Sequence, residues 1–351
     1  MSILYGIFFA LRQLLTSEGF PPKPQFEEKD VPDLSGKVVF PLFHAREYMR
    51  PNLPIVYLIT GGAGGIGFEL VKILYSKNAN VYIAGRSSDN AIAAVNKIRE
   101  EYPKSDGGLA FLQLDLSDLT SIKPAVDKFL QKERRLDAVV HNAGIMITPT
   151  HWRTVQGWDI QFGTNVIGPF VLQRHLQNIL VETAKIAPKN SVRTVFLSSI
   201  SAPLAPPGGI DYKNLESKGV SAFSAIQYFD SGLKYAHSKC ANTIMAMGFA
   251  QKFKDTGIIA VSANPGNLNT DLLRHSLIAW VFFRPWLYPA RYGAITELYA
   301  TLSPEINDTS NGALIIPWGR TGPIRQDILD SCQEGGAVKF WDWLDENTQG
   351  F

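Results

Sequence analysis

Tyr235 and Lys239 are the pair of side chains in this sequence best suited to acid–base chemistry. They stand at positions i and i+4, so an α-helix would present both on one face. A phenol has an ordinary pKa of about 10, which must fall by about 3 before the group exchanges protons near neutral pH. A cation about 4 Å away, at an effective dielectric of about 20, supplies roughly the 4 kcal/mol required. The spacing therefore predicts proton transfer by Tyr235, with Lys239 lowering its pKa.

A glycine-rich stretch, T-G-G-A-G-G-I-G over residues 60–67, is the second feature with chemical potential. It follows the apolar run 55–59 and precedes residues 68–75, whose apolar positions have helical spacing. At such a strand-to-helix turn, Gly61 permits the tight turn, Gly65 lets the backbone approach a pyrophosphate, and Gly67 lets the helix pack closely. The helix N-terminus favours negative charge, so Thr60, Gly61, Gly65, Ile66 and Gly67 are expected to bind phosphates.

These two features must be positioned by a sheet, because apolar strand-like segments recur along the chain with helical segments between them. The alternation predicts an α/β fold with one doubly wound, Rossmann-type domain, in which helices flank a parallel sheet. The chemical motifs are distributed along the whole series, so a separate substrate domain is not expected. The expected strands cover residues 55–59, 81–84, 110–114, 136–140, 192–197, 258–262 and 312–317.

Taken together, the glycine stretch, the sequence Asn142-Ala143-Gly144, Ser199 at a strand end and the Y-x-x-x-K of Tyr235 and Lys239 resemble the short-chain dehydrogenase/reductases. The resemblance covers roughly residues 55–320. The 36-residue interval from Ser199 to Tyr235 is similar to that of the retinol-dehydrogenase-like and fungal carbonyl-reductase-like branch.

The resemblance implies four catalytic residues: Asn165, Ser199, Tyr235 and Lys239. Ser199 would hold the substrate oxygen, Tyr235 would donate or accept its proton, and Lys239 would also bind the nicotinamide ribose. Asn165 follows Asn142 by 23 positions within a long apolar helix expected from Trp152, and in the family this residue connects to the lysine through a bound water.

The resemblance also implies further contacts to the cofactor. Asp115 and Leu116 would meet the adenine, although Asp115 with Ser117 could instead cap a helix beginning near Leu119. The ribose would be lined by Asn142, Ala143 and Gly144, which His141 precedes in place of an asparagine. The residues expected near the nicotinamide are Pro265, Gly266, Asn267, Asn269 and Thr270.

Arg86 indicates which nicotinamide cofactor is bound. The second strand ends at Ala84-Gly85, where a cofactor with a bare ribose usually meets a carboxylate. Arg86 instead offers a planar fork that suits the 2′-phosphate of NADP(H). A surface arginine with no ligand is the alternative, and the glycine stretch supplies no second basic residue.

The expected activity is NADP(H)-dependent reduction of a ketone or aldehyde, or the reverse oxidation of an alcohol, with fungal secondary metabolism as a setting. The apolar segment 277–287 occupies the family's lid position and favours a lipophilic small substrate, although core packing or a membrane contact would explain it too. A catalytically silent cofactor-binding scaffold and a reductase of carbon–carbon double bonds are the alternatives. A homo-oligomer is compatible with the family.

Composition excludes several other classes. The net charge is +2 and no basic run occurs, which argues against a nucleic-acid partner. The two cysteines, Cys240 and Cys332, form no metal-binding pattern and no disulfide framework, so no metal is expected. This usage fits a reducing compartment, and the cytoplasm is the expected location.

The ends of the chain add to the central domain, which is expected over residues 36–320. Residues 1–35 are expected to form a helix and an extended arm. The apolar run 3–15 is too short to span a bilayer, so it either packs on the body or makes a peripheral membrane contact. Residues 321–351 should form a tail whose aromatic side chains pack on the domain. Residues 39–56 interrupt the expected first strand, either as a translated intron or as a genuine surface insertion.

Overall fold

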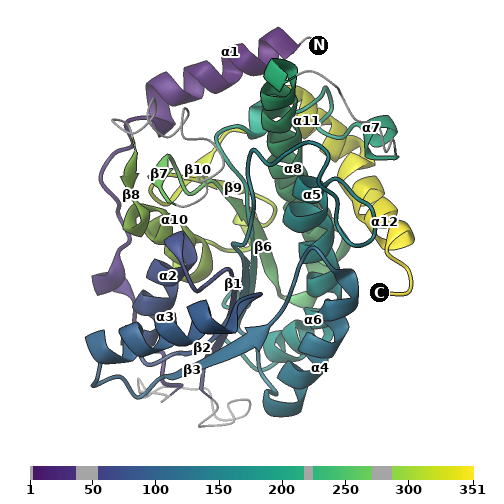
Figure 1. Ribbon diagram of the computed structural model, residues 1–351. Helices are drawn as coiled ribbons and strands as arrows, with labels where there is room; N and C mark the ends of the chain where they lie inside the picture. Colours follow the sequence, from purple (N-terminus) through teal and green to yellow (C-terminus); the bar gives the residue numbers. More distant parts are fainter. Residues whose placement is uncertain (1–2, 37–53, 217–223, 271–286) are drawn as a thin grey trace.

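The computed structural model describes residues 3–36, 54–216, 224–270 and 287–351, and its centre is an eight-stranded sheet (Figure 1). The strand order is β10-β9-β6-β5-β4-β1-β2-β3, and all neighbours pair in parallel except β10 with β9. Crossing from β3 back to β4 gives the doubly wound topology. The strands are β1 (Val56–Thr60), β2 (Asn80–Gly85), β3 (Gly108–Gln113), β4 (Ala138–His141), β5 (Arg193–Leu197), β6 (Ile259–Ala263), β9 (Leu314–Ile316) and β10 (Arg320–Gly322).

Helices cover both faces of this sheet, as Figure 1 shows. One face carries α2 (Gly65–Ser76), α3 (Ser88–Glu101) and α10 (Ala290–Leu302), and the other carries α4 (Ile122–Lys132), α6 (Gly168–Ala184) and α8 (Ser224–Lys252). Strand β1 shows why the sheet is apolar throughout. Val56 and Leu58 join the core under α4, α6 and α8, whereas Tyr57 and Ile59 join the core under α2, α3 and α10.

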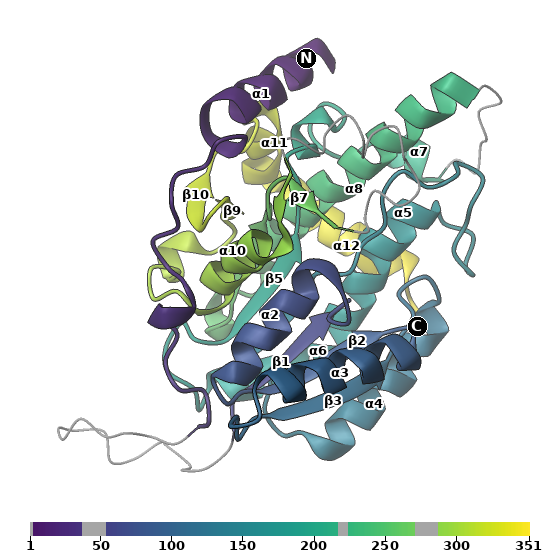
Figure 2. The ribbon, with the colours of Figure 1, turned by 60° about the vertical axis from the view of Figure 1, so that its left-hand side comes forward.

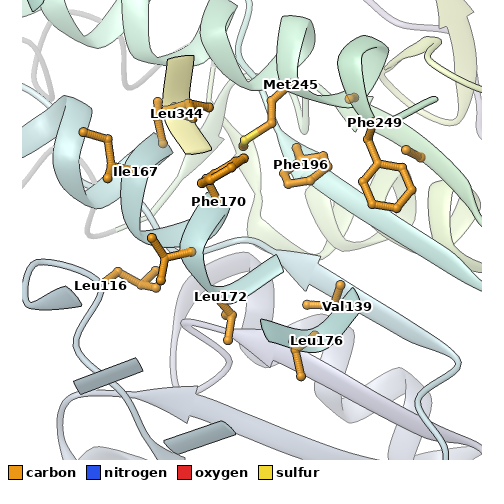
Figure 3. Packing of buried hydrophobic residues seen from close by; sticks show 14 of the residues in the cluster. Leu116, Val139, Ile167, Phe170, Leu172, Leu176, Phe196, Met245, Phe249 and Leu344 are labelled. Carbon is orange, nitrogen blue, oxygen red and sulfur yellow. The ribbon is translucent and has the colours of Figure 1, made fainter. Parts of the chain in front are cut away.

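The larger of the two cores is built around Phe170 on α6 (Figure 3). Phe196 of β5 and Met245 of α8 lie beside it, and Leu344 of α12 (Ala337–Asn347) closes the outer side. All four side chains are fully buried. The C-terminal helix is therefore part of the core.

The tail expected at residue 321 begins inside a structural element, because β10 runs from Arg320 to Gly322 as an antiparallel strand. The doubly wound parallel sheet expected from the sequence is confirmed, and β10 adds one antiparallel strand at its edge. After β10 come α11 (Gln326–Ser331), the π-turn η10 (Cys332–Gly336) and α12, which packs along α8. Phe340 and Trp341 are buried in that contact.

The N-terminal segment is a helix, α1 (Ile3–Gln13), followed by a π-turn, η1 (Leu14–Glu18), and an extended arm with the short turn η2 (Glu28–Asp30). It lies over η5 (Ala202–Leu204) at one end of the molecule (Figure 2). The side facing the body includes Gly6, Gln13 and Glu18, which are buried. The helix therefore packs on the body, but Phe8, Leu11 and Leu15 are exposed.

Two expectations about local structure were wrong. The helix expected from Trp152 begins at Ile160, because Asp159 accepts the N–H groups of Gln161 and Phe162 and caps it. The cap near Leu119 is Asp118, whose side chain accepts the N–H of Thr120 ahead of η3 (Leu119–Ser121). Most of segment 39–56 lies outside the described residues, although Val56 is the first residue of β1. Short elements complete the chain: α5 (Ile160–Phe162), η4 (Gly163–Ile167), α7 (Tyr212–Glu216), η6 (Lys254–Thr256), β7 (Leu268–Asn269), β8 (Tyr288–Pro289) and η9 (Asp308–Ser310).

Candidate active site

The glycine stretch forms the turn between β1 and α2. Gly61 has a φ of +69° and donates its N–H to the carbonyl of Ala84 at 2.8 Å, which turns the chain at the end of β1. Gly65, with a φ of +55°, begins α2, and a Cβ there would approach nothing closer than the Thr270 side chain at 3.7 Å. The backbone at the N-terminus of α2 therefore faces open space that a phosphate could occupy.

Gly67 has a different role, because a Cβ there would lie 2.5 Å from Nδ2 of Asn142 and 2.8 Å from the carbonyl oxygen of Gly61. The same Asn142 amide donates to the carbonyl of Thr60 at 2.7 Å, and the Thr60 hydroxyl accepts the N–H of Ala143 at 3.0 Å. These bonds tie the ends of β1 and β4 together. Gly67 thus allows close packing, as the sequence indicated, and it does not line the pocket.

Asn165 lies in the π-turn η4, between α5 and α6. Its Oδ1 accepts the N–H of Ile145 at 2.9 Å, and its Nδ2 donates to the carbonyl of Ile145 and to the Ser238 hydroxyl, both at 3.0 Å. The side chain therefore binds protein groups on both sides of its amide. Widened helical turns of this kind often occur at functional sites.

Tyr235 and Lys239 both lie on α8 and are buried. The Lys239 ammonium donates to the carbonyl of Leu197 at 3.0 Å, at the end of β5, and lies 5.6 Å from the centre of the Tyr235 ring. The Tyr235 hydroxyl lies close enough to the Ser199 side chain for an interaction between the two to lower the pKa of Tyr235. A Cβ on Gly144 would lie 3.3 Å from the Lys239 nitrogen and from Oδ1 of Asn165, so a glycine there leaves room for these two catalytic candidates.

Burial sets the charge states of this pair. It raises the pKa of Tyr235 to about 12, against a lowering effect of the Ser199 hydrogen bond. It also lowers the pKa of Lys239 to about 8, against a raising effect of the Glu297 carboxyl group. Burial thus shifts the pKa of Tyr235 upward, opposite to the lowering by Lys239 that the sequence predicted.

The two serines after β5 differ in their partners. Ser198 is buried, donating its hydroxyl to the carbonyl of Lys239 at 3.0 Å and accepting that of Thr243 at 2.9 Å. Ser199 is partly exposed, and its hydroxyl accepts from the hydroxyl and N–H of Ser201 at 3.1 and 3.2 Å. Ser199 is thus the serine whose hydroxyl faces Tyr235.

A pocket of about 830 Å³ joins the glycine turn to the Tyr235–Lys239 pair. Fourteen of the residues predicted to bind cofactor or substrate line it: Thr60, Gly61, Gly65, Ile66, Arg86, Asp115, Leu116, Asn142, Ala143, Gly144, Tyr235, Lys239, Pro265 and Thr270. Six others do not line it: Gly67, Asn165, Ser199, Gly266, Asn267 and Asn269. Ser199 instead lines a neighbouring cavity of about 20 Å³, together with Gln13 and Glu18.

At the far end of the pocket, Arg86 is exposed just after β2, and Asp115 follows β3. The Asp115 carboxylate accepts the N–H and hydroxyl of Ser117, at 2.8 and 2.6 Å, and does not cap the following helix. Lys97 of α3 lines the same end and lies 5.3 Å from the centre of the Phe68 ring. Sequence reasoning missed this second cation, although the spacing from Asn90 to Lys97 places both on one helical face.

Glu297 is a second residue that sequence reasoning missed. It lies on α10 with no exposed surface, and neither carboxyl oxygen has a hydrogen-bond partner among the described residues. Burial raises its pKa to about 8, against a lowering effect of Lys239. Glu297 stands in a helix of apolar and small residues. A charged residue in an amphipathic helix usually faces solvent, so nothing in the sequence indicated that this one is buried.

His141 packs in the core. Its ring stacks on Phe196 with centres 4.7 Å apart, and its Nε2 is 3.0 Å from the Gln173 amide oxygen. Burial lowers the pKa of His141 to about 4, so the ring is neutral at physiological pH. The substitution of asparagine by His141 thus leaves the cofactor pocket, lined by Asn142 onward, unchanged.

Comparison with known proteins places this geometry in a family. A model of the short chain dehydrogenase family matches residues 55–213. The chain is 38% identical over 345 residues to the short-chain dehydrogenase/reductase bet4 of Neocamarosporium betae, covering 95% of this chain and 92% of that protein. The protein belongs to the short-chain dehydrogenase/reductase family. It is also 38% identical to a short-chain dehydrogenase/reductase of Phomopsis amygdali, over 99% of this chain and all of that protein.

Solved structures share the family's fold. A protein of Mycobacterium paratuberculosis superimposes with a TM-score of 0.61 at 23% identity, covering 92% of this chain and 97% of that one. An NADPH-bound carbonyl reductase from chicken fatty liver superimposes with a TM-score of 0.57 at 20% identity, covering 78% of this chain and all of that one. This short-chain dehydrogenase/reductase is thus an oxidoreductase with the nicotinamide-binding Rossmann fold of its family.

Membrane-spanning helices and metal clusters are both lacking in the part of the chain that the structure describes. No helix there has the length and apolar character needed to span a bilayer. Among the same residues, no three histidine, cysteine, aspartate or glutamate side chains gather as a metal site would require.

Proposed function

We propose that this short-chain dehydrogenase/reductase reduces the carbonyl group of a lipophilic ketone or aldehyde with NADPH, or oxidises the corresponding alcohol with NADP⁺. The observation that carries the proposal is the convergence of Ser199, Tyr235 and Lys239 beside the pocket that begins at the glycine turn. A scaffold without activity would not need a buried, protonated phenol and a buried lysine at this point. Reduction of a carbon–carbon double bond remains the alternative chemistry.

The residues present fit the cofactor. Open backbone at Gly65 and the N-terminus of α2 suit its pyrophosphate, and the wall formed by Asn142, Ala143 and Gly144 suits a ribose. Pro265 and Thr270 line the same pocket and would contact the nicotinamide. When bound, the cofactor supplies or accepts the hydride.

In the proposed reaction, the Ser199 hydroxyl holds the substrate oxygen and Tyr235 provides the proton. Its raised pKa keeps the phenol protonated, so reduction begins with the donor in the required state. Lys239 lies close enough to stabilise the phenolate that this transfer leaves, provided that the lysine is protonated. Asn165 fixes Ile145 and Ser238 around the pair.

The preference for NADP(H) is supported by two cations, Arg86 and Lys97, at the pocket's far end. The carbonyl reductase from chicken fatty liver, which shares the fold, holds NADPH in its crystal structure. The lid expected to favour lipophilic substrates, residues 277–287, lies outside the described residues except for Leu287. The organisms of the two matched proteins support a place in fungal secondary metabolism, and we expect that role to be carried out in the cytoplasm.

The test is a panel of lipophilic ketones and aldehydes offered to the purified protein with NADPH, with products identified by mass spectrometry. Tyr235→Phe should abolish carbonyl reduction and leave NADPH binding nearly unchanged, because it removes only the acidic hydroxyl. A saturated ketone produced from an enone, and formed equally well by the variant, would instead identify a double-bond reductase. Binding without turnover of any substrate would support the scaffold.

A peripheral membrane contact is a second proposal, favoured by the exposed face of α1. Phe8, Leu11 and Leu15 are 67%, 51% and 71% exposed and share one side of the helix. We expect the protein to float with liposomes, and the triple substitution of these residues by serine to abolish flotation without changing turnover. A wild-type protein that stays in solution would refute the contact.

A further inference from the structure

Glu18 is a buried carboxyl group in the N-terminal segment. Only 2% of its surface is exposed, and its carboxylate accepts a hydrogen bond from the side-chain amide of Asn264. Burial raises the pKa of Glu18 to about 7, against lowering effects of Asn264 and Arg320. A carboxyl group is costly to bury, so this contact calls for an explanation beyond packing.

Asn264 links Glu18 to the backbone of Gly266, on the side of the pocket where the nicotinamide is expected. It follows β6, and its own N–H donates to the carbonyl of Ile315 at 2.8 Å. Its Oδ1 accepts the N–H of Gly266 at 3.1 Å. This side-chain-to-backbone turn holds Gly266 at a φ of +94°, directly after Pro265 in the pocket wall.

The two ends of the Asn264 amide are therefore fixed from opposite sides. An amide can rotate by 180° and exchange its oxygen and nitrogen. The Glu18 carboxylate accepts only from the nitrogen end, which leaves the oxygen end for Gly266. Without this acceptor, the bond from Gly266 alone would have to hold the amide in its orientation.

Other bonds hold Glu18 in place. The Arg320 guanidinium donates to the carbonyl of Ser17 at 2.7 Å, and the Tyr288 hydroxyl donates to that of Gly19 at 3.2 Å. These donors come from β10 and from β8, which pairs with β7 just after the Pro265–Gly266 turn. The N-terminal segment is thus anchored to the same wall that Asn264 supports.

We propose that Glu18 is a positioning residue for the nicotinamide side of the cofactor site, acting through the Asn264 amide on the backbone of Gly266. The inference rests on the proposed cofactor-binding function. In this proposal, the N-terminal segment helps to shape the cofactor site. The adenine end of the pocket lies on the other side of the glycine turn and does not depend on Glu18.

The test compares two ligands by calorimetry: NADPH, and adenosine 2′,5′-bisphosphate, which lacks the nicotinamide half. Glu18→Met removes the acceptor and keeps the side-chain volume, and should weaken NADPH binding about tenfold, as expected for a hydrogen bond to a charged group. Binding of the bisphosphate should stay unchanged. Glu18→Gln keeps an acceptor and should restore NADPH affinity. The matched control is Glu28→Gln. Glu28 lies on the same N-terminal arm, and the change breaks its partly exposed ion pair with Arg291 of α10.

Unchanged NADPH affinity in Glu18→Met, or an equal loss for both ligands, would overturn the inference. If Glu18→Met does not fold, Asn264→Leu replaces it, because leucine is similar in size but can neither accept from Gly266 nor donate to Glu18. The same selective loss of NADPH affinity is then expected, and its absence refutes the role. A wild-type protein that binds neither ligand refutes the proposed function itself, and the inference with it.

Discussion

Burial moves the acid and the base of this active site toward their neutral forms. The Tyr235 phenol keeps its proton, and Lys239, with a pKa near 8, is close to losing its own. The nearest compensating group is Glu297, itself buried and raised in pKa. At the scale of single residues, the protonation states of Tyr235, Lys239 and Glu297 are therefore coupled, because charging each of these buried groups changes the cost of charging the others.

Glu297→Met should stabilise the protein, and more so at higher pH. The folded-state pKa of about 8 lies above the ordinary 4.5, so the folded protein keeps a proton that the unfolded chain releases between these values. The free energy of unfolding therefore falls as pH rises through this window. The opposite shift of Lys239 acts mainly above pH 8.

We expect Glu297→Met to raise the free energy of unfolding by about 1–3 kcal/mol near pH 8, the cost of an unpartnered buried group, and by less near pH 5. Urea unfolding at the two pH values measures this difference. Glu182→Met, at an exposed position, serves as the control. A gain of equal size at both pH values would show that Glu297 is not the titrating group.

Arg86→Ala tests cofactor choice. If Arg86 binds the 2′-phosphate, its loss should weaken NADPH binding about 10- to 100-fold, corresponding to a hydrogen bond with charged groups of about 1.5–3 kcal/mol. NADH lacks that phosphate, so its affinity should change little. Fluorescence titration of both cofactors measures the two effects, with Lys97→Ala expected to act in the same direction but more weakly. If the affinities for NADPH and NADH fell equally, Arg86 would not be the residue that binds the 2′-phosphate.

At the scale of elements, most strands were predictable because β1, β4, β5, β6 and β9 are buried along their whole length and read as short apolar runs. β1, β2, β5 and β6 lie within one or two residues of their expected bounds. The antiparallel β10 was not predictable, since Arg320, Thr321 and Gly322 carry no apolar signal and pair only because β9 lies beside them. The π-turn holding Asn165 was hidden for a similar reason: its cause is a contact with Ile145, distant in sequence.

The insertion at residues 39–56 gives a prediction at the same scale. The joined sequence Lys37-Val38-Tyr57 would supply Val38 in place of Val56, whose N–H donates to the Asp137 carboxylate at 2.9 Å. Any residue other than proline can make that backbone bond. Deletion of 39–56 should therefore keep or raise the melting temperature, and transcript sequencing should reveal messages without it. A deletion variant that cannot fold, with every message retaining the segment, would establish a genuine insertion.

At the scale of the whole molecule, the C-terminal helix α12 packs on the catalytic domain and shares its hydrophobic core. Trp341 of α12 meets the rings of Phe170, Phe249 and Phe253 at centre distances of 4.9, 5.6 and 5.5 Å. The sequence showed the aromatic residues of this tail but not their partners, because the partners lie on α6, on α8 and just after α8.

Trp341→Ala should lower the free energy of unfolding by about 3–5 kcal/mol, as removal of a large core side chain does. Because α12 shares its core with α6 and α8, we expect one cooperative transition in both proteins, at lower denaturant for the variant. Trp152→Ala, at a 43% exposed position, should change stability little. A separate early transition for the C-terminal helix would show that it docks as an independent unit.

The contact between Glu18 and Asn264 also has a consequence for the order of folding. It joins residues 246 positions apart, so the chain between them contains nearly every strand of the sheet. Closing so long a loop costs entropy and is slow relative to local structure. During synthesis, the segment that holds Glu18 leaves the ribosome before β6, so it cannot dock on Asn264 until that later strand has been made. We therefore expect refolding protein to regain its helical signal first, and full affinity for the complete nucleotide only afterwards.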